Sequence, residues 1–153
     1  MDRIDRAILR ELQLDGRLSI VELASRVNLT KTPCSERLRK LESSGVIRGY
    51  RADLDPVALE AAHIVLVQVI LRGTTADELE RFNEAVRKVP EIQSCHMIAG
   101  DFDYLLKVRT HDIQHYRRLL GDKISRLPHV QQTHTYVVME TVKDDTTIPV
   151  PPC

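Results

Sequence analysis

Residues Ser19 to Gly45 (SIVELASRVNLTKTPCSERLRKLESSG) constrain this chain more than any other stretch, because they predict two short helices joined by a tight turn. Ser19 and Glu22 have the spacing of a capping box, in which each side chain accepts a hydrogen bond from the other residue's backbone N–H. Apolar residues then recur at i, i+3, i+4 and i+7 between Ile20 and Val27, as on one face of a helix. Asn28 ends that pattern and tolerates the left-handed backbone of a sharp turn.

The second helix is expected to begin near Thr30 to Thr32, either of which can cap it, and Gly45 suits the position just after its end. Pro33 is tolerated because first-turn N–H groups lack helical partners. The apolar residues share one side (Cys34, Leu38 and Leu41), whereas short polar and basic residues lie around the opposite side. Such a helix fits the major groove of DNA. The alternative is an ordinary helical hairpin with a solvated polar face.

The distribution of charge favours the DNA-binding interpretation. The net charge is zero, but residues 1–51 contain 11 Lys and Arg against 7 Asp and Glu, whereas the remainder contains 11 against 15. A basic N-terminal part joined to an acidic C-terminal part is expected when only one domain contacts phosphate. A first helix capped by Asp2 precedes the pair. Residues 46–52 (VIRGYRA) are β-prone and basic, and they predict a small wing with Arg48 and Arg51 near phosphate.

From residue 61 onwards the pattern is that of a second, mixed domain. Residues 63–71 (HIVLVQVIL) are almost continuously apolar and predict a strand buried on both faces. The later elements are a helix after the Thr75/Glu78 capping box, strands at 92–99 and 104–109, a helix opened by Thr110 or Asp112, and a strand at 130–142. The order β-α-β-β-α-β predicts an α+β, ferredoxin-like sandwich. Its helix-free face is apolar, and a second copy of the chain would cover it.

These patterns divide the chain into a winged helix-turn-helix domain (1–52), a linker (53–60), a ferredoxin-like domain (61–142) and a flexible proline-rich tail (143–153). No run is apolar enough to span a membrane, and no signal peptide is recognisable. The three cysteines form neither a disulfide framework nor a CxxC pair, which indicates a reducing cytoplasm. His111 and His115 have helical i, i+4 spacing but no evident third ligand, so we expect no metal, no cofactor and no catalytic site.

Several blocks taken together resemble the leucine-responsive regulatory protein/asparagine regulator (Lrp/AsnC) family of transcription factors, closest to its leucine-responsive branch. They are Asp2-Arg3-Ile4-Asp5, Thr32-Pro33-Cys34 with Glu36-Arg37, Gly100-Asp101-Phe102-Asp103-Tyr104-Leu105-Leu106 and Thr135-Tyr136-Val137-Val138-Met139. The resemblance covers nearly the whole chain. It implies a winged helix-turn-helix domain that binds double-stranded DNA and an effector domain that dimerises and binds amino acids. It also implies dimers assembled into octamers or similar discs, although the chain departs from that branch in lacking its longer N-terminal extension and in its proline-rich tail.

The predicted DNA-binding residues lie on the second helix of the pair and on the wing. Phosphate contacts are expected from Arg37, Lys40, Arg48 and Arg51, and base contacts from Thr32, Ser35, Glu36 and Arg39, with Lys31 beside them. Arginine can fork to guanine and glutamate can accept from the cytosine amine, each good pair being worth about 1–3 kcal/mol of discrimination. The alternative for Glu36 is an ion pair with Lys40 one helical turn away.

The best candidate for an effector site is the turn Gly100-Asp101-Phe102-Asp103-Tyr104. Asp101 and Asp103 can accept hydrogen bonds from the ammonium of an amino acid, and backbone N–H groups near Gly100 can donate to its carboxylate. Apolar neighbours would line a pocket for an aliphatic side chain, and the predicted effector set is therefore Met97, Gly100, Asp101, Asp103, Tyr104, Tyr136 and Val138. The alternative is that both aspartates merely satisfy a hairpin turn.

The sequence thus predicts a cytoplasmic, nucleoid-associated and sequence-specific DNA-binding regulator. A small amino acid, leucine or another hydrophobic one, would modulate its DNA binding or its assembly. One rival hypothesis is an architectural chromatin protein that compacts DNA without a ligand. Another is a ferredoxin-like enzyme with a helical appendage, but no Ser/His/Asp set or phosphate loop supports catalysis.

Overall fold

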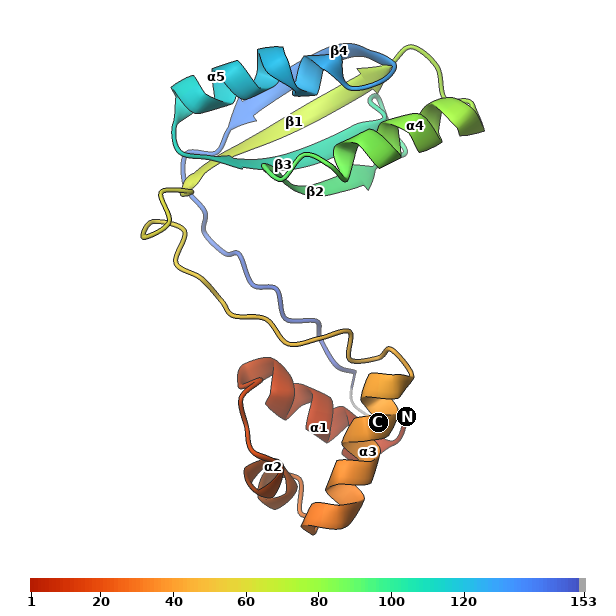
Figure 1. The fold of residues 1–153 in the computed structure, drawn as a ribbon, viewed down its shortest axis with the longest axis vertical. Coiled ribbons are helices and arrows are strands. Elements are labelled where there is room, and N and C mark those ends of the chain that lie inside the picture. The colour runs from red at the N-terminus through yellow and green to blue at the C-terminus, as the bar shows by residue number, and fades with distance from the viewer. Residues whose placement is uncertain (152–153) are drawn as a thin grey trace. The chain divides into compact units, whose positions relative to one another are not determined.

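The computed structural model describes residues 1–151, and the chain divides into two compact units (Figure 1). The head unit consists of Met1–Asp53 together with the segment that begins at Lys143. The sheet unit consists of Leu54–Val142. The proline-rich segment expected to be a separate flexible tail is therefore grouped with the N-terminal helices.

Three helices build the head unit: α1 (Arg3–Leu14), α2 (Ile20–Arg26) and α3 (Lys31–Ser43). The predicted Ser19/Glu22 capping box begins α2, and a second capping box between Asp2 and Asp5 begins α1. Thr30 occupies the N-cap position of α3, but its side chain makes no capping hydrogen bond. Asn28 has a φ of 55°, as expected of the turn between α2 and α3. The helices pack around Ile8, Leu23 and Cys34, each fully buried.

Residues 46–52, where the sequence predicts a small wing, form an irregular segment, and the structure describes no β-strand between α3 and residue 63. Gly45 and Gly49 have φ values of 75° and 150°, which turn the backbone away from an extended course. The Tyr50 hydroxyl donates to Glu42 Oε1 at 2.9 Å and ties the segment back to α3. A short β-prone run needs a neighbouring strand with which to pair, and this one has none.

The segment after Lys143 contacts α1. The Gln13 side chain brackets the backbone of Ile148, donating to its carbonyl at 2.9 Å and accepting from its N–H at 2.7 Å. Arg6 Nη1 donates to the carbonyl of Pro151 at 3.2 Å. The proline-rich segment thus lies along α1 as an extended chain, because prolines deprive it of the N–H groups that a helix or sheet would need.

The sheet unit has the predicted β-α-β-β-α-β order. Its elements are β1 (His63–Leu71), α4 (Ala76–Val86), β2 (Ile92–Met97), β3 (Tyr104–Thr110), α5 (Ile113–Asp122), the 3₁₀ turn η1 (Ile124–Arg126) and β4 (Val130–Val137). The strands are antiparallel in the order β2-β3-β1-β4. β4 ends before its predicted limit of 142. Val138 N–H donates to the Ile64 carbonyl, and the chain beyond it runs past the start of its partner β1.

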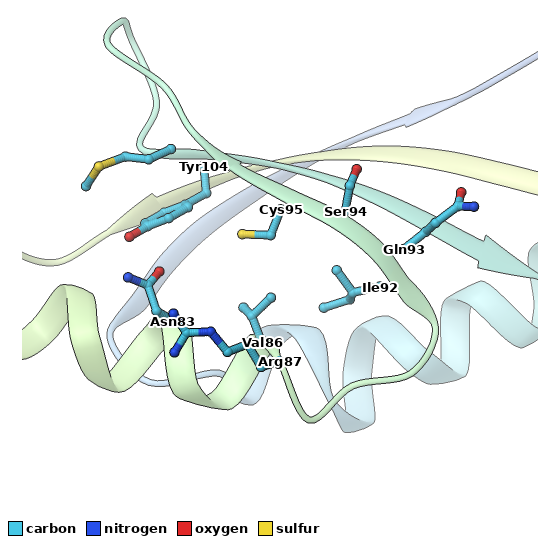
Figure 2. Close-up of a pocket in the computed structure, with 9 residues that line it drawn as sticks. Asn83, Val86, Arg87, Ile92, Gln93, Ser94, Cys95 and Tyr104 are labelled. Atoms are coloured by element: carbon cyan, nitrogen blue, oxygen red, sulfur yellow. The ribbon is translucent and has the colours of Figure 1, made fainter. Parts of the chain in front are cut away.

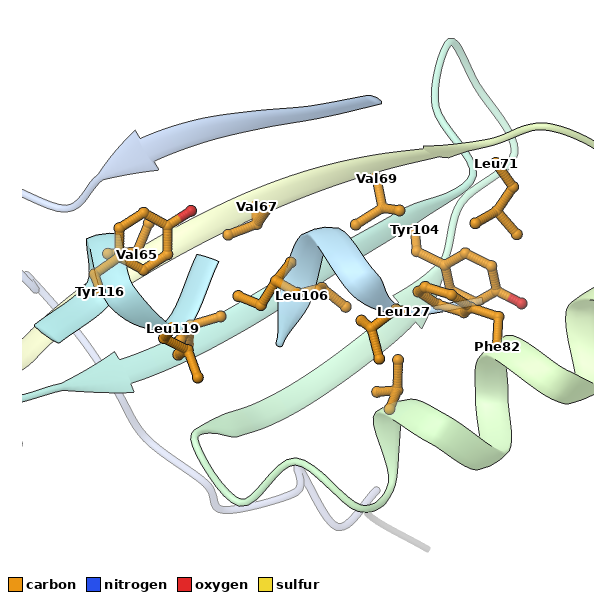
Figure 3. Close-up of a cluster of buried hydrophobic side chains, with 13 residues drawn as sticks. Val65, Val67, Val69, Leu71, Phe82, Tyr104, Leu106, Tyr116, Leu119 and Leu127 are labelled. Atoms are coloured by element: carbon orange, nitrogen blue, oxygen red, sulfur yellow. The ribbon is translucent and has the colours of Figure 1, made fainter. Parts of the chain in front are cut away.

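Alternate residues of β1 face the two helices and form the core of the sheet unit (Figure 3). Val65, Val67 and Val69 are fully buried there, against residues of both α4 and α5. The intervening Leu66, Gln68 and Ile70 are only half-buried. The prediction that β1 is buried on both faces is therefore wrong for a single chain, since helices cover only one side of this sheet.

Candidate functional site

α3 exposes the polar and basic face that the sequence predicts. Thr32, Glu36 and Arg39 lie on the side of α3 opposite Cys34 and Leu41, which are buried. Of the other predicted DNA-binding residues on α3, Lys31 and Lys40 are exposed and Ser35 is half-buried. Within residues 1–151, no ion pair joins Glu36 to Lys40, so the carboxylate remains available to solvent.

Arg37 is used differently from its neighbours. A phosphate contact is predicted for it, and in the structure its Nη1 atom lies 2.6 Å from Asp2 Oδ2 and 2.8 Å from Asp5 Oδ1. Arg37 lies three residues after Cys34, and helical geometry turns it towards the buried side of α3 and the start of α1. It therefore fastens α3 to α1.

This cluster makes the head unit sensitive to acid. Hydrogen bonding from the backbone N–H of Asp5, reinforced by Arg37, lowers the pKa of Asp2 to about 2. A carboxyl whose pKa is lower in the folded state contributes stability above its unfolded pKa and loses it as the pH falls towards the folded value. We therefore expect the melting temperature of the head unit to drop when the pH is lowered from about 4 to about 2. The drop should be smaller in Asp2→Asn than in the unchanged chain, because the variant has no carboxyl to protonate at this position. Circular dichroism melts at both pH values measure this, and equal losses would contradict it.

Arg48 and Arg51 are exposed on the irregular segment that follows α3, where a wing was expected. Burial, together with the hydrogen bond to Glu42, raises the pKa of Tyr50, which lies between them, to about 12. Tyr50 therefore stays protonated and keeps its donor bond to α3 at any physiological pH. This bond positions both arginines next to the C-terminal end of α3.

In the turn between β2 and β3, Asp103 has a structural role. Its Oδ2 atom accepts from Leu71 N–H at 2.7 Å, its backbone N–H donates to the Val69 carbonyl, and its carbonyl accepts from Ile98 N–H. These bonds join the turn to the end of β1, in line with the alternative that aspartates satisfy a hairpin. Asp101 and Gly100 are exposed in the same turn.

The predicted effector residues fall into two groups in one chain. The turn group contains Met97, Gly100, Asp101, Asp103 and Tyr104 at the β2–β3 connection. The β4 group contains Tyr136, which pairs with Leu66, and Val138, which bonds to Ile64. β2 and β4 are opposite edges of the sheet, about 14 Å apart at a strand spacing of about 4.8 Å, and the two groups lie at opposite ends of β1. One chain cannot enclose a small molecule with both groups.

A hollow of about 420 Å³ lies between α4 and the edge strand β2 (Figure 2). Met97 and Tyr104 are the members of the predicted effector set that line it. Asn83 and Arg87 line it from α4, and neither residue belongs to the predicted effector set. Their i, i+4 spacing was the one available signal. Burial raises the pKa of Cys95, also in the lining, to about 11, so its thiol is protonated and not nucleophilic.

Among residues 1–151, no helix is both long enough and apolar enough to cross a membrane. In the same part of the chain, no three His, Cys, Asp or Glu side chains are grouped so that they could hold a metal ion. The His111 ring lies close to two carboxylates instead, with Nδ1 3.8 Å from Glu60 Oε2 and Nε2 3.9 Å from Asp112 Oδ2. All three side chains are exposed.

One unit exposes a polar and basic helix, and the unit that follows in the sequence has a ferredoxin-like fold. This combination is typical of one class of protein, the two-domain DNA-binding regulators. Comparison with protein families agrees. Residues 1–48 match a winged helix-turn-helix DNA-binding domain, and residues 64–148 match the Lrp/AsnC ligand binding domain. The chain belongs to the Lrp/AsnC family of transcriptional regulators, whose members are not enzymes.

Similar proteins support this assignment along the whole chain. The leucine-responsive regulatory proteins of Klebsiella pneumoniae and Escherichia coli K12 are each 56% identical over 143 residues, covering 94% of this chain and 87% of theirs. A solved AsnC family regulator from Agrobacterium tumefaciens is 38% identical, with a TM-score of 0.93 and 97% of each chain covered. A Neisseria meningitidis regulator solved in complex with L-Met is 35% identical, with a TM-score of 0.91, covering 97% of this chain and 96% of its own.

Proposed function

We propose that this regulator responds to a hydrophobic amino acid, with leucine as the first candidate, and that the ligand changes its DNA affinity or its assembly. The match of residues 64–148 to the family's ligand-binding domain carries the proposal. Relatives that are 56% identical are named for their response to leucine, and a similar regulator was solved with L-Met. Leucine has a branched apolar side chain and methionine an unbranched one, and the two are similar in size.

α3 reads the DNA in this proposal. Arg39, Glu36, Thr32 and Ser35 contact base edges, while Lys31, Lys40, Arg48 and Arg51 contact phosphate. The exposure of α3 and its polar composition support these roles. Arg37 has the supporting role of holding α3 on α1, because two carboxylates already bind its guanidinium.

The effector site lies between two copies of the chain. The turn group of one protomer and the β4 group of another supply the two sides of the pocket, since a single chain separates them. The half-exposed Leu66 and Ile70 on the helix-free face of the sheet support a homodimer, which would assemble further to an octamer or a similar disc in the cytoplasm, on the nucleoid. Binding at such an interface couples the amino acid to the arrangement of the head units.

A titration of labelled DNA from upstream of this protein's own gene tests the proposal. It is run without ligand and with each of the amino acids, at fixed salt because phosphate contacts are salt-dependent. We expect one hydrophobic amino acid to change the affinity by several-fold to about a hundredfold, the range of a coupling of about 1–3 kcal/mol.

Substitutions assign that effect to the turn. Asp101→Asn should abolish it without lowering stability, because Asp101 is exposed. Asp103→Ala should lower stability as well, because it removes the carboxylate oxygen that accepts from Leu71 N–H. Asp122→Asn, at the exposed end of α5, is the matched control and should change neither. Tight DNA binding that no amino acid affects would support the architectural chromatin protein instead.

A further inference from the structure

The hollow between α4 and β2 has the composition of a binding site of its own. It is large enough for a small organic molecule, since ligand pockets begin at about 300 Å³. Val86, Ile92 and Met97 contribute apolar surface. Asn83 and Arg87 lie at the end near Tyr104, and Ser94 and Gln93 lie towards the other end (Figure 2). The predicted effector site at the turn does not account for Asn83 or Arg87.

Tyr104 supplies the observation that points to a ligand. Its side chain is 2% exposed, and its hydroxyl makes no hydrogen bond of good geometry among residues 1–151, although the Asn83 side chain is close enough to act on its pKa. Leaving a buried hydroxyl unpaired is costly, so such a group usually meets a partner that comes from outside the chain. Figure 2 shows the hydroxyl pointing towards Asn83, with Arg87 beside it. Burial raises the pKa of Tyr104, so the hydroxyl is protonated and can donate.

The charge of the lining selects the ligand. Arg87 is the cation of the hollow, and no Asp or Glu belongs to the lining. Its contact with Glu80, at 3.6 Å between side chains that are 68% and 63% exposed, is a weak surface pair that a better acceptor can replace. Arginine, amide and hydroxyl donors together match a carboxylate. The lining itself offers no carboxylate to the ammonium of an amino acid, unlike the Asp101 turn, since Glu80, which contacts Arg87, lies outside it.

We propose that this hollow is a second ligand site, which binds a small aliphatic monocarboxylate that lacks an ammonium group. Arg87, Asn83 and Tyr104 hold the carboxylate, and Val86, Ile92 and Met97 surround the aliphatic chain. Branched 2-oxo acids and short fatty acids share this chemistry. The regulator would then sense an amino acid at one site and a deaminated or purely aliphatic acid at the other.

Isothermal titration calorimetry of the full chain tests this inference with three probes of similar size: 4-methyl-2-oxopentanoate, 4-methylpentanoate and leucine. Arg87→Gln should weaken binding of the first two probes by about tenfold to a hundredfold, because it removes the charged donor. Tyr104→Phe should weaken it several-fold. Lys88→Gln, which removes the adjacent cation outside the lining, should leave it unchanged. A preference between the two acids shows whether the 2-oxo group is recognised.

This experiment tests the second ligand site separately from the effector site of the proposed function. Leucine binding that depends on Asp101 and not on Arg87, together with acid binding that depends on Arg87 and not on Asp101, establishes two sites. The inference is overturned if neither acid binds at millimolar concentration, or if Arg87→Gln and Lys88→Gln bind the acids equally well. Leucine binding lost in Arg87→Gln would also overturn it, since the hollow would then belong to the effector site.

Discussion

The Arg39→Ala variant is expected to bind its operator about five- to 150-fold more weakly, a loss of about 1–3 kcal/mol. Arg39 is exposed on the side of α3 opposite the buried residues, so its guanidinium can fork to a base without disturbing the head unit. The loss should fall mainly on one base position, and the melting temperature should not change. Fluorescence anisotropy at fixed salt, with operators that differ at single positions, measures the effect.

Arg37→Ala is the matched control, because it removes the same group from the same helix. Arg37 binds Asp2 and Asp5, so its loss should lower the stability of the head unit. Any weakening of DNA binding should then be uniform across operator sequences. If Arg39→Ala instead weakens binding equally for every sequence, Arg39 contacts phosphate and the assignment of base readout to it is wrong.

Phe82→Ala is expected to lower the free energy of unfolding of the sheet unit by about 3–5 kcal/mol, the usual cost of truncating a buried aromatic residue. Phe82 is 0% exposed and is the largest fully buried side chain of the core. Its ring centroid lies 4.5 Å from that of Tyr104, at an interplanar angle of 38°. The substitution therefore also removes the support of Tyr104. Urea unfolding followed by circular dichroism measures the loss.

Two further variants interpret that result. Phe82→Leu keeps most of the volume and should cost much less than Phe82→Ala. Glu84→Ala, on the exposed side of the same helix, should stay within about 0.5 kcal/mol of the unchanged chain. A loss below about 1 kcal/mol in Phe82→Ala would show that α4 is not packed on the sheet as the structure places it.

Local chemistry explains which parts of the fold were predictable. The starts of two helices were predictable, because the hydrogen bonds of a capping box join residues three apart in the sequence, as at Ser19/Glu22 and Thr75/Glu78. β1 was predicted with its observed bounds, because seven of its nine residues are Val, Ile or Leu. The irregular conformation of residues 46–52 was not predictable, since β-propensity gives no information on whether a partner strand is present. The limits of β4 also depend on a partner, in this case the start of β1.

The candidate sites were predictable only where they lie on a single element. The exposed face of α3 follows from helical periodicity, although Arg37 falls outside it and its two acidic partners are on α1. Periodicity says nothing about sheet order, so the separation of Tyr136 from Asp101 became visible only with the topology β2-β3-β1-β4. The hollow beside Tyr104 combines α4, β2 and β3, and the i, i+4 spacing of Asn83 and Arg87 alone does not reveal it.

The contact of the proline-rich segment with α1 has a consequence for synthesis on the ribosome. Gln13 and Ile148 are 135 residues apart, so translation at about 5–20 residues per second separates them by roughly 7–27 s. The three head helices can pack within that interval, but they do so before their last partner has been made. In a nascent or prematurely terminated chain, α1 of the head unit therefore lacks its contact with the proline-rich segment. That contact can form only after the whole sheet unit has been synthesised.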